Sequence, residues 1–133
     1  MKVLVDTPIW SYALRSNRKG FEKHVAKLEN LIFDQRVLII GPIRQEVLSG
    51  YSDRKLFEKL RKKLSYFENT AIIEGDYVDG ARLYNICRQK GIQGSHIDLL
   101  ICAISIRLKA EIFTTDQDFD FYQKHIPIKQ HHP

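Results

Sequence analysis

The sequence predicts an α/β fold with three layers, α/β/α, built around a central, mostly parallel sheet of four or five strands. Short apolar runs, such as residues 3–5 and 37–40, alternate along the chain with longer segments in which apolar residues have a helical spacing. A short run that is apolar throughout is typical of a strand buried on both faces, as in a parallel sheet. Strands that alternate with helices are joined by right-handed crossovers, which place helices over the sheet.

Length and composition are those of one globular domain, expected to span residues 1–133. The chain is 44% hydrophobic and 28% charged, a balance that fits a folded core rather than a disordered chain. No stretch approaches the roughly 20 apolar residues of a membrane span, and the first apolar run is too short for a signal peptide. We therefore expect a cytoplasmic protein without membrane association, in which Cys87 and Cys102 are reduced core thiols. The net charge of +5 suits a phosphate-rich partner, although so modest an excess is common.

The first strand is predicted at residues 3–5 and ends at Asp6. Pro8 follows two positions later, and its fixed φ suits the first turn of a helix that should run to about Ser16. A second helix is predicted over residues 21–32, because its apolar residues form one stripe and its charged residues lie off that stripe. This order places Asp6 at the carboxyl end of a strand, the edge where open α/β sheets bind their ligands.

A second strand is predicted at residues 37–40 and is followed by a helix that begins near Pro42 and includes residues 43–48. Asp53 is suited to cap a further helix, whose basic residues face outward. The residues of that helix expected to face inward are Leu56, Phe57, Leu60 and Leu64.

The second half of the chain predicts the remaining strands. Residues 70–73 and 111–114 are apolar runs of strand length, and residues 126–128 fit a short edge strand, where proline is tolerated. Residues 116–120 are rich in acids and are expected to form a turn.

Two helices are predicted between these strands. Asp76 is expected to cap the first, which should stop at Gly91. The second begins after Ser95 and is apolar nearly all round over residues 99–108, which is typical of a helix packed inside against a sheet.

Four acidic residues each stand close to an element that should end at the same edge of the sheet. They are Asp6, Glu46, Asp98 and Asp116. Two unit charges about 4 Å apart repel by about 4 kcal/mol at an effective dielectric constant near 20, so a cluster of this kind takes up protons or binds a cation. Oxygen ligands without cysteine or histidine favour a hard ion, Mg²⁺ or Mn²⁺.

Each acid also has an ordinary explanation. Asp98 could be a helix cap, Asp6 and Asp116 could accept hydrogen bonds from a turn, and Glu46 could be a solvated surface residue. Asp118 belongs to the acid-rich turn and could be only a turn former. The prediction of a metal site therefore depends on the equivalent positions of the four acids and not on any one of them.

The chain resembles PIN-domain proteins and, more narrowly, VapC-type toxin ribonucleases, over essentially its whole length. The resemblance rests on four motifs in order: VLVDTPIW at residues 3–10, PIRQEVLSG at 42–50, IDLLICA at 97–103 and TTDQDF at 114–119. The residue after Asp-Thr is often Ser in the family and is Pro8 here. Pro8 also stands where an aspartyl-phosphate phosphatase would carry a second Asp, which argues against that alternative.

This resemblance implies a Mg²⁺- or Mn²⁺-dependent endoribonuclease, the toxin of a type II toxin–antitoxin system, that hydrolyses phosphodiesters of tRNA or rRNA. It also implies a cognate VapB-like antitoxin and a homodimer. Asp6, Glu46, Asp98 and Asp116 become the catalytic acids, with Asp6, Asp98 and Asp116 as metal ligands and Asp118 as a less certain one. Glu46 would order or deprotonate the attacking water.

The resemblance and the charge pattern also suggest residues that bind the substrate. Thr114 matches a hydroxyl position near the phosphate or metal in the family, while Arg15 and Arg44 are basic residues expected near the acids. Two alternatives stay open: a PIN-domain module that binds RNA without cutting it, and a PIN nuclease that acts outside toxin–antitoxin systems.

Overall fold

The computed structural model describes residues 1–133 and contains seven helices and three strands. Helices and strands alternate much as the sequence predicts. In chain order the elements are β1 (Val3–Val5), α1 (Thr7–Leu14), α2 (Glu22–Phe33), β2 (Val37–Leu38), α3 (Gly41–Ser49), α4 (Arg54–Leu64), α5 (Glu74–Gln89), α6 (His96–Leu108), β3 (Glu111–Phe113) and α7 (Asp118–Gln123).

The sheet is parallel, with strand order β2-β1-β3. It has three strands, so the prediction of four or five strands is wrong in number, although the parallel arrangement is confirmed. In the register of the sheet, Leu4 pairs with Leu38 on one side and with Ile112 on the other. β1 therefore lies in the centre and is buried on both faces.

The two missing strands are reduced to single bridges at the two edges of the sheet. Residues 70–73 do not form a strand, and only Asn69 bridges to Ile39 beyond β2. Residues 126–128 do not form one either, and only Gln130 bridges to Ile112 beyond β3. In the first case the partner segment enters α3 at Gly41, two residues after Ile39, so residues 70–73 have no extended chain left to pair with.

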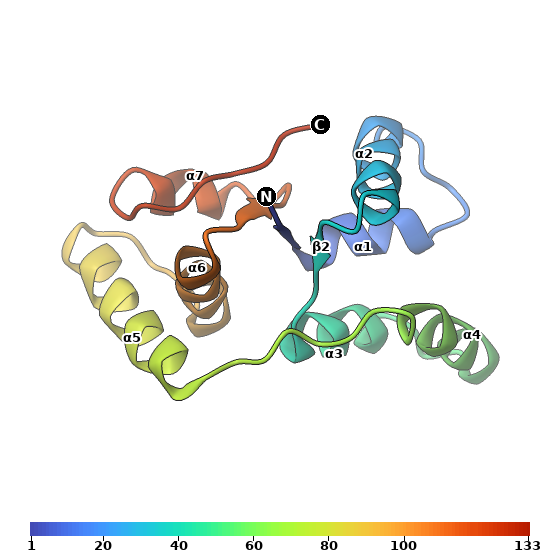
Figure 1. Ribbon diagram of the computed structural model, residues 1–133, viewed down its shortest axis with the longest axis horizontal. Helices are drawn as coiled ribbons and strands as arrows, with labels where there is room; N and C mark the ends of the chain where they lie inside the picture. The colour runs from blue at the N-terminus through green and yellow to red at the C-terminus, as the bar shows by residue number, and fades with distance from the viewer.

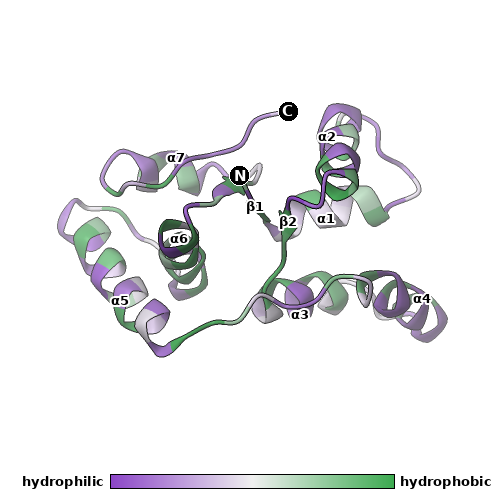
Figure 2. Cartoon of the chain, viewed as in Figure 1, coloured by the Kyte–Doolittle hydropathy of each residue, from purple (hydrophilic) through white to green (hydrophobic).

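The helices lie on both sides of the sheet. Figure 1 shows α5 and α6 on one side and α1 to α4 on the other, which gives the predicted three layers. One apolar cluster of 24 buried residues fills the space between the layers. Figure 2 shows that α6, between α5 and the sheet, is mostly hydrophobic, and that α4 is hydrophilic over much of its surface.

Two helix boundaries differ from the prediction. Asp76 caps α5 from within its first turn and not from the residue before it: its Oδ2 accepts a hydrogen bond from the N–H of Ile73, the N-cap residue, at 3.0 Å. The predicted acidic turn at residues 116–120 becomes helix α7 from Asp118 onward, because Phe119 and Tyr122 are both buried on its inner face. Cys87 and Cys102 are free and buried, as predicted. None of the helices is both long and apolar enough to cross a membrane.

Candidate metal centre

The centre of the candidate site is Asp6, at the point where β1 ends and α1 begins. Val5 pairs with Phe113, so the chain leaves β1 and β3 side by side at one edge of the sheet. This register brings Thr114 next to Asp6, and the Thr114 hydroxyl donates to Asp6 Oδ2 at 2.8 Å. The other oxygen, Oδ1, accepts from the N–H of Thr7 at 2.9 Å and caps α1.

Asp6 is a buried carboxylate with no cationic partner. Only 6% of the residue is exposed, and both of its hydrogen bonds come from uncharged donors. Burial raises the pKa of Asp6 to about 6; the hydrogen bonds from Thr114 and Thr7 oppose this rise, and the charges of Asp98 and Glu46 add to it. The electrostatic environment of Asp6 therefore favours a proton or a bound cation.

Three other carboxylates form a close group that does not include Asp6, although the charge of Asp98 helps to raise the Asp6 pKa. Asp98, Asp116 and Asp118 each offer an oxygen, and these oxygens all lie within 4.8 Å of one another. Burial raises the pKa of Asp98, and the charges of Asp116 and Asp118 raise it further, whereas hydrogen bonds from Tyr122 and Ser95 lower it. Two oxygens bound to one Mg²⁺ lie at most about 4.2 Å apart, so this set of donors fits a hard cation with little movement.

The local sequence explains how these three acids are placed. Ser95 caps α6, its Oγ accepting from the Asp98 N–H at 3.1 Å, which fixes Asp98 in the first turn. The Asp116 N–H donates to Thr114 Oγ1 at 3.0 Å, and the Asp118 N–H donates to Asp116 Oδ1 at 2.9 Å. The Thr114 hydroxyl therefore links the loop that carries Asp116 directly to Asp6.

Glu46 comes from α3 and is held by a different contact. Its Oε2 accepts a hydrogen bond from the Thr7 hydroxyl at 3.0 Å, next to Asp6 in the chain. Its charge is one of those that raise the pKa of Asp6. Glu46 thus stands on the Asp6 side of the site and is not part of the cluster of Asp98, Asp116 and Asp118.

Tyr122 also contacts this site, although the sequence analysis does not include it among the site residues. Its hydroxyl donates to Asp98 Oδ2 at 2.8 Å, and the whole residue is buried. The buried ring packs edge-on against Phe119, with the ring centroids 5.3 Å apart. The signal in the sequence is the spacing of Asp118, Phe119 and Tyr122, which would have predicted a helix with an inner face if the acids had not suggested a turn.

The two arginines predicted to bind substrate have contacts within the protein. Arg44 donates to Asn69 Oδ1 at 2.9 Å and to the carbonyl oxygens of Leu64 and Phe67, so its guanidinium ties α3 to the segment after α4. The Arg15 guanidinium lies over the Tyr12 ring, 5.4 Å from its centroid. Neither arginine forms an ion pair with a site acid.

Comparison with known proteins shows the family and the fold of the chain. The family model of the PIN domain matches residues 3–124. The chain belongs to the PIN-domain family. PIN domains are typically nucleases, and PIN nucleases usually use divalent metals.

Two solved structures show the same fold. A crystal structure of FitAcB from Neisseria gonorrhoeae aligns with a TM-score of 0.80 at 20% identity, covering 98% of this chain and 96% of that one. A crystal structure of VapBC2 from Rickettsia felis, bound to a DNA fragment from their promoter, aligns with a TM-score of 0.78 at 21% identity and covers 98% of each chain. Among curated proteins there is no significant sequence match.

Proposed function

We propose that this PIN-domain protein is a VapC-type toxin, a Mg²⁺- or Mn²⁺-dependent endoribonuclease that hydrolyses phosphodiesters in tRNA or rRNA. The observation that carries the proposal is the close group of Asp98, Asp116 and Asp118, together with the buried Asp6, which has no cationic partner and whose pKa the charge of Asp98 helps to raise. A folded protein tolerates such a concentration of carboxylates at a cost in stability, and a divalent cation removes that cost.

Asp6, Asp98 and Asp116 are the proposed metal ligands, and the position of Asp118 within the cluster supports its inclusion. A bound Mg²⁺ would neutralise charge on the phosphodiester and make a water more acidic. Glu46 is the proposed general base, because its second carboxylate oxygen is free to accept a proton while Thr7 holds the first. Thr114 keeps Asp6 in place by giving its hydroxyl proton to it, so as a proposed substrate contact its oxygen would accept a hydrogen bond from the RNA.

Arg15 and Arg44 remain proposed for RNA binding, Arg15 as a direct contact and Arg44 as a residue that positions α3. Arg15 has no acid partner and can turn toward a phosphate. Arg44 already donates to three acceptors, so its part in binding RNA would be to keep α3, and with it Glu46, in position.

The proposal includes the biological setting of VapC proteins. Both solved structures with the same fold carry the names of such two-component complexes, FitAcB and VapBC2, which supports a cognate VapB-like antitoxin as partner. A homodimer, a cytoplasmic location and a single domain over residues 1–133 complete the proposal. The single apolar cluster, which draws on both sides of the sheet, supports the last point.

The test is RNA cleavage by the purified protein with Mg²⁺, with Mn²⁺ and with EDTA. We expect metal-dependent cutting of structured RNA, and Asp6→Asn should reduce it at least about 1,000-fold because the charge at the centre of the site is lost. Asp79→Asn is the matched control, since Asp79 is an exposed acid paired with Arg82 on α5. Full cutting by Asp6→Asn would overturn the mechanism, and RNA binding without a metal-dependent product would favour the binding-module alternative.

A further inference from the structure

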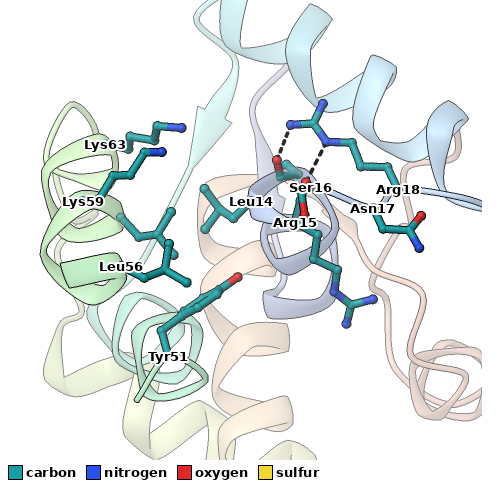
Figure 3. Close-up of a pocket in the computed structure, with 11 residues that line it drawn as sticks. Leu14, Arg15, Ser16, Asn17, Arg18, Tyr51, Leu56, Lys59 and Lys63 are labelled. Carbon is teal, nitrogen blue, oxygen red and sulfur yellow. Dashed lines mark hydrogen bonds between the residues drawn. The ribbon is translucent and has the colours of Figure 1, made fainter. Parts of the chain in front are cut away.

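A groove separates the end of α1 from α4. It has a volume of about 560 Å³ and is lined by 11 residues, none of which is acidic. Figure 3 shows the loop after α1 on one side and α4 on the other. Leu14, Leu56 and Leu60 are among its apolar residues. Its polar groups come from Tyr51, Lys59 and Lys63 on one side and from residues 15–18 on the other.

The two lysines have no partner within the protein. Lys59 and Lys63 lie one turn apart on α4, and neither takes part in any of the five ion pairs of the structure. Both side chains extend in the same direction into the space between α4 and α1 (Figure 3). Like charges at this spacing repel, so an anion placed between them is favoured.

Two arginines, Arg15 and Arg18, line the opposite side of the groove, and one of them is already used. Arg18 donates to the carbonyl oxygens of Ala13 at 2.6 Å and Arg15 at 3.2 Å, which closes the end of α1, and it lies 3.7 Å from Glu29. Arg15 has no acid partner, so the free positive charge of the groove comes from the lysine pair on α4 and from Arg15 across from it.

The groove is connected to the metal centre by two helices. Asp6 caps the start of α1, and Leu14, at its other end, lines the groove, so the two are separated by about 12 Å along the helix. Glu46 lies on α3, and Tyr51 follows the end of that helix. An RNA strand bound at the metal centre would need to extend only a few nucleotides from the cleaved bond to reach the groove.

We propose that this groove is a subsite for single-stranded RNA, in which Lys59 and Lys63 bind backbone phosphates and the Tyr51 ring stacks on a base. The inference rests on the proposed function. Basic side chains beside an aromatic ring are the usual means by which proteins hold a single strand. An apolar protein segment fits less well, because it would bury two ammonium groups without supplying an acceptor for either.

The experiment measures binding of a single-stranded RNA oligonucleotide by fluorescence anisotropy in EDTA, so that no cleavage occurs. The test variant is Lys59→Gln with Lys63→Gln. The control is Lys55→Gln with Lys62→Gln, which removes the same charge from exposed positions of α4 outside the groove. We expect the test variant to bind about tenfold more weakly and its slope of log K against log salt to flatten by about 1.4, or 0.7 for each phosphate contact, with both values unchanged in the control.

A second measurement tests the base contact. RNA that contains 4-thiouridine, irradiated on the wild-type protein, should form a cross-link to the peptide that carries Tyr51, and Tyr51→Ala should remove it. Equal slopes for the two lysine variants, or a cross-link elsewhere, would overturn the subsite. A third outcome would also overturn the subsite: the test variant loses binding to polyglutamate but keeps its binding to RNA. The groove would then bind an acidic protein segment.

The outcome stays separate from that of the proposed function, which is judged by cleavage with Mg²⁺. A wild-type protein that cuts RNA while both lysine variants bind it equally contradicts only the subsite. A wild-type protein that binds RNA in this groove but never cuts it contradicts only the nuclease.

Discussion

Two buried aspartates at the starts of helices, Asp6 and Asp76, have opposite electrostatic environments. Asp76 is 1% exposed, and Arg107 donates to its two oxygens at 2.7 and 2.8 Å. This pair lowers the pKa of Asp76, with the hydrogen bond from Arg107 as the main cause. Asp6 is 6% exposed, has no cation beside it, and has a pKa raised to about 6 by burial.

The difference distinguishes a carboxylate that stabilises the fold from one that is available to bind a ligand. The charge of Asp76 is neutralised within the fold, and the pair joins α5 to α6, with Arg107 also donating to the Ala71 carbonyl at 3.1 Å. The charge of Asp6 is surrounded by other acids, so the fold itself supplies nothing to neutralise it. A buried carboxylate of the second kind marks a functional site better than burial or hydrogen bonding alone.

Exchanging each aspartate for asparagine should separate stability from activity. Asp76→Asn should lower the free energy of unfolding by about 2 kcal/mol, less than for a fully buried pair because 32% of the Arg107 side chain is exposed. Asp6→Asn should leave that free energy unchanged or raise it, because at pH 7 it removes a buried charge that lacks a partner. Urea unfolding of both variants in EDTA measures the two effects.

The order of the two variants should be reversed when RNA cleavage is measured: Asp6→Asn should lose activity and Asp76→Asn should keep it. Asp76→Asn keeps its activity at temperatures where it is folded, since Asp76 and Arg107 do not contact the acids of the metal centre. If Asp6→Asn instead unfolds more easily than Asp76→Asn, the distinction between the two carboxylates is wrong.

Tyr122 offers a smaller change within the metal centre. Its hydroxyl is the side-chain donor to Asp98, so Tyr122→Phe leaves that carboxylate free to turn and should weaken Mn²⁺ binding about tenfold. Tyr12→Phe is the matched control, because the Tyr12 hydroxyl pairs at 2.9 Å with Thr115 Oγ1 and not with an acid. Electron paramagnetic resonance of free Mn²⁺ measures both affinities, and equal losses in the two variants would contradict a specific role for Tyr122.

The sequence predicts the order of helices and strands well because local signals mark most boundaries. Pro8 begins α1 near its predicted place, and Asp53 and Ser95 cap α4 and α6 through side-chain hydrogen bonds. The strand number is wrong because residues 70–73 and 126–128 have the composition of strands, while pairing depends on where the neighbouring helix begins and how the chain returns.

The site is predicted less completely, since its geometry depends on contacts distant in sequence. The four predicted acids lie at one edge of the sheet, but only Asp98 and Asp116 share the close cluster, with Asp118 as its third member. Tyr122 binds Asp98 across 24 positions, and Arg107 pairs with Asp76 across 31. No periodicity or spacing reveals such partners, which is why Arg44 looked like a candidate for RNA binding although its guanidinium bonds to the protein itself.

The smallest expected effect is a dependence of stability on pH that belongs to Asp6 and not to Asp76. Because the pKa of Asp6 is about 6 in the folded protein and 3.8 for an unperturbed aspartate, the native state binds a proton more tightly than the unfolded chain does. Its contribution should therefore make the protein more stable by about 1 kcal/mol as the pH falls from about 7 to about 5. The contribution of Asp76 to stability has the opposite sign, since its pKa is lowered in the folded protein. That contribution is lost only in more acidic solution, below the pKa of an unperturbed aspartate. Urea unfolding at the two pH values in EDTA should show that Asp6→Asn lacks this gain, which assigns the gain to Asp6. Mg²⁺ at pH 7 should stabilise the wild-type protein more than Asp6→Asn, since the cation takes the place of the proton. An identical pH dependence in both proteins would mean that Asp6 is neutralised within the fold after all, and the contrast with Asp76 would fail.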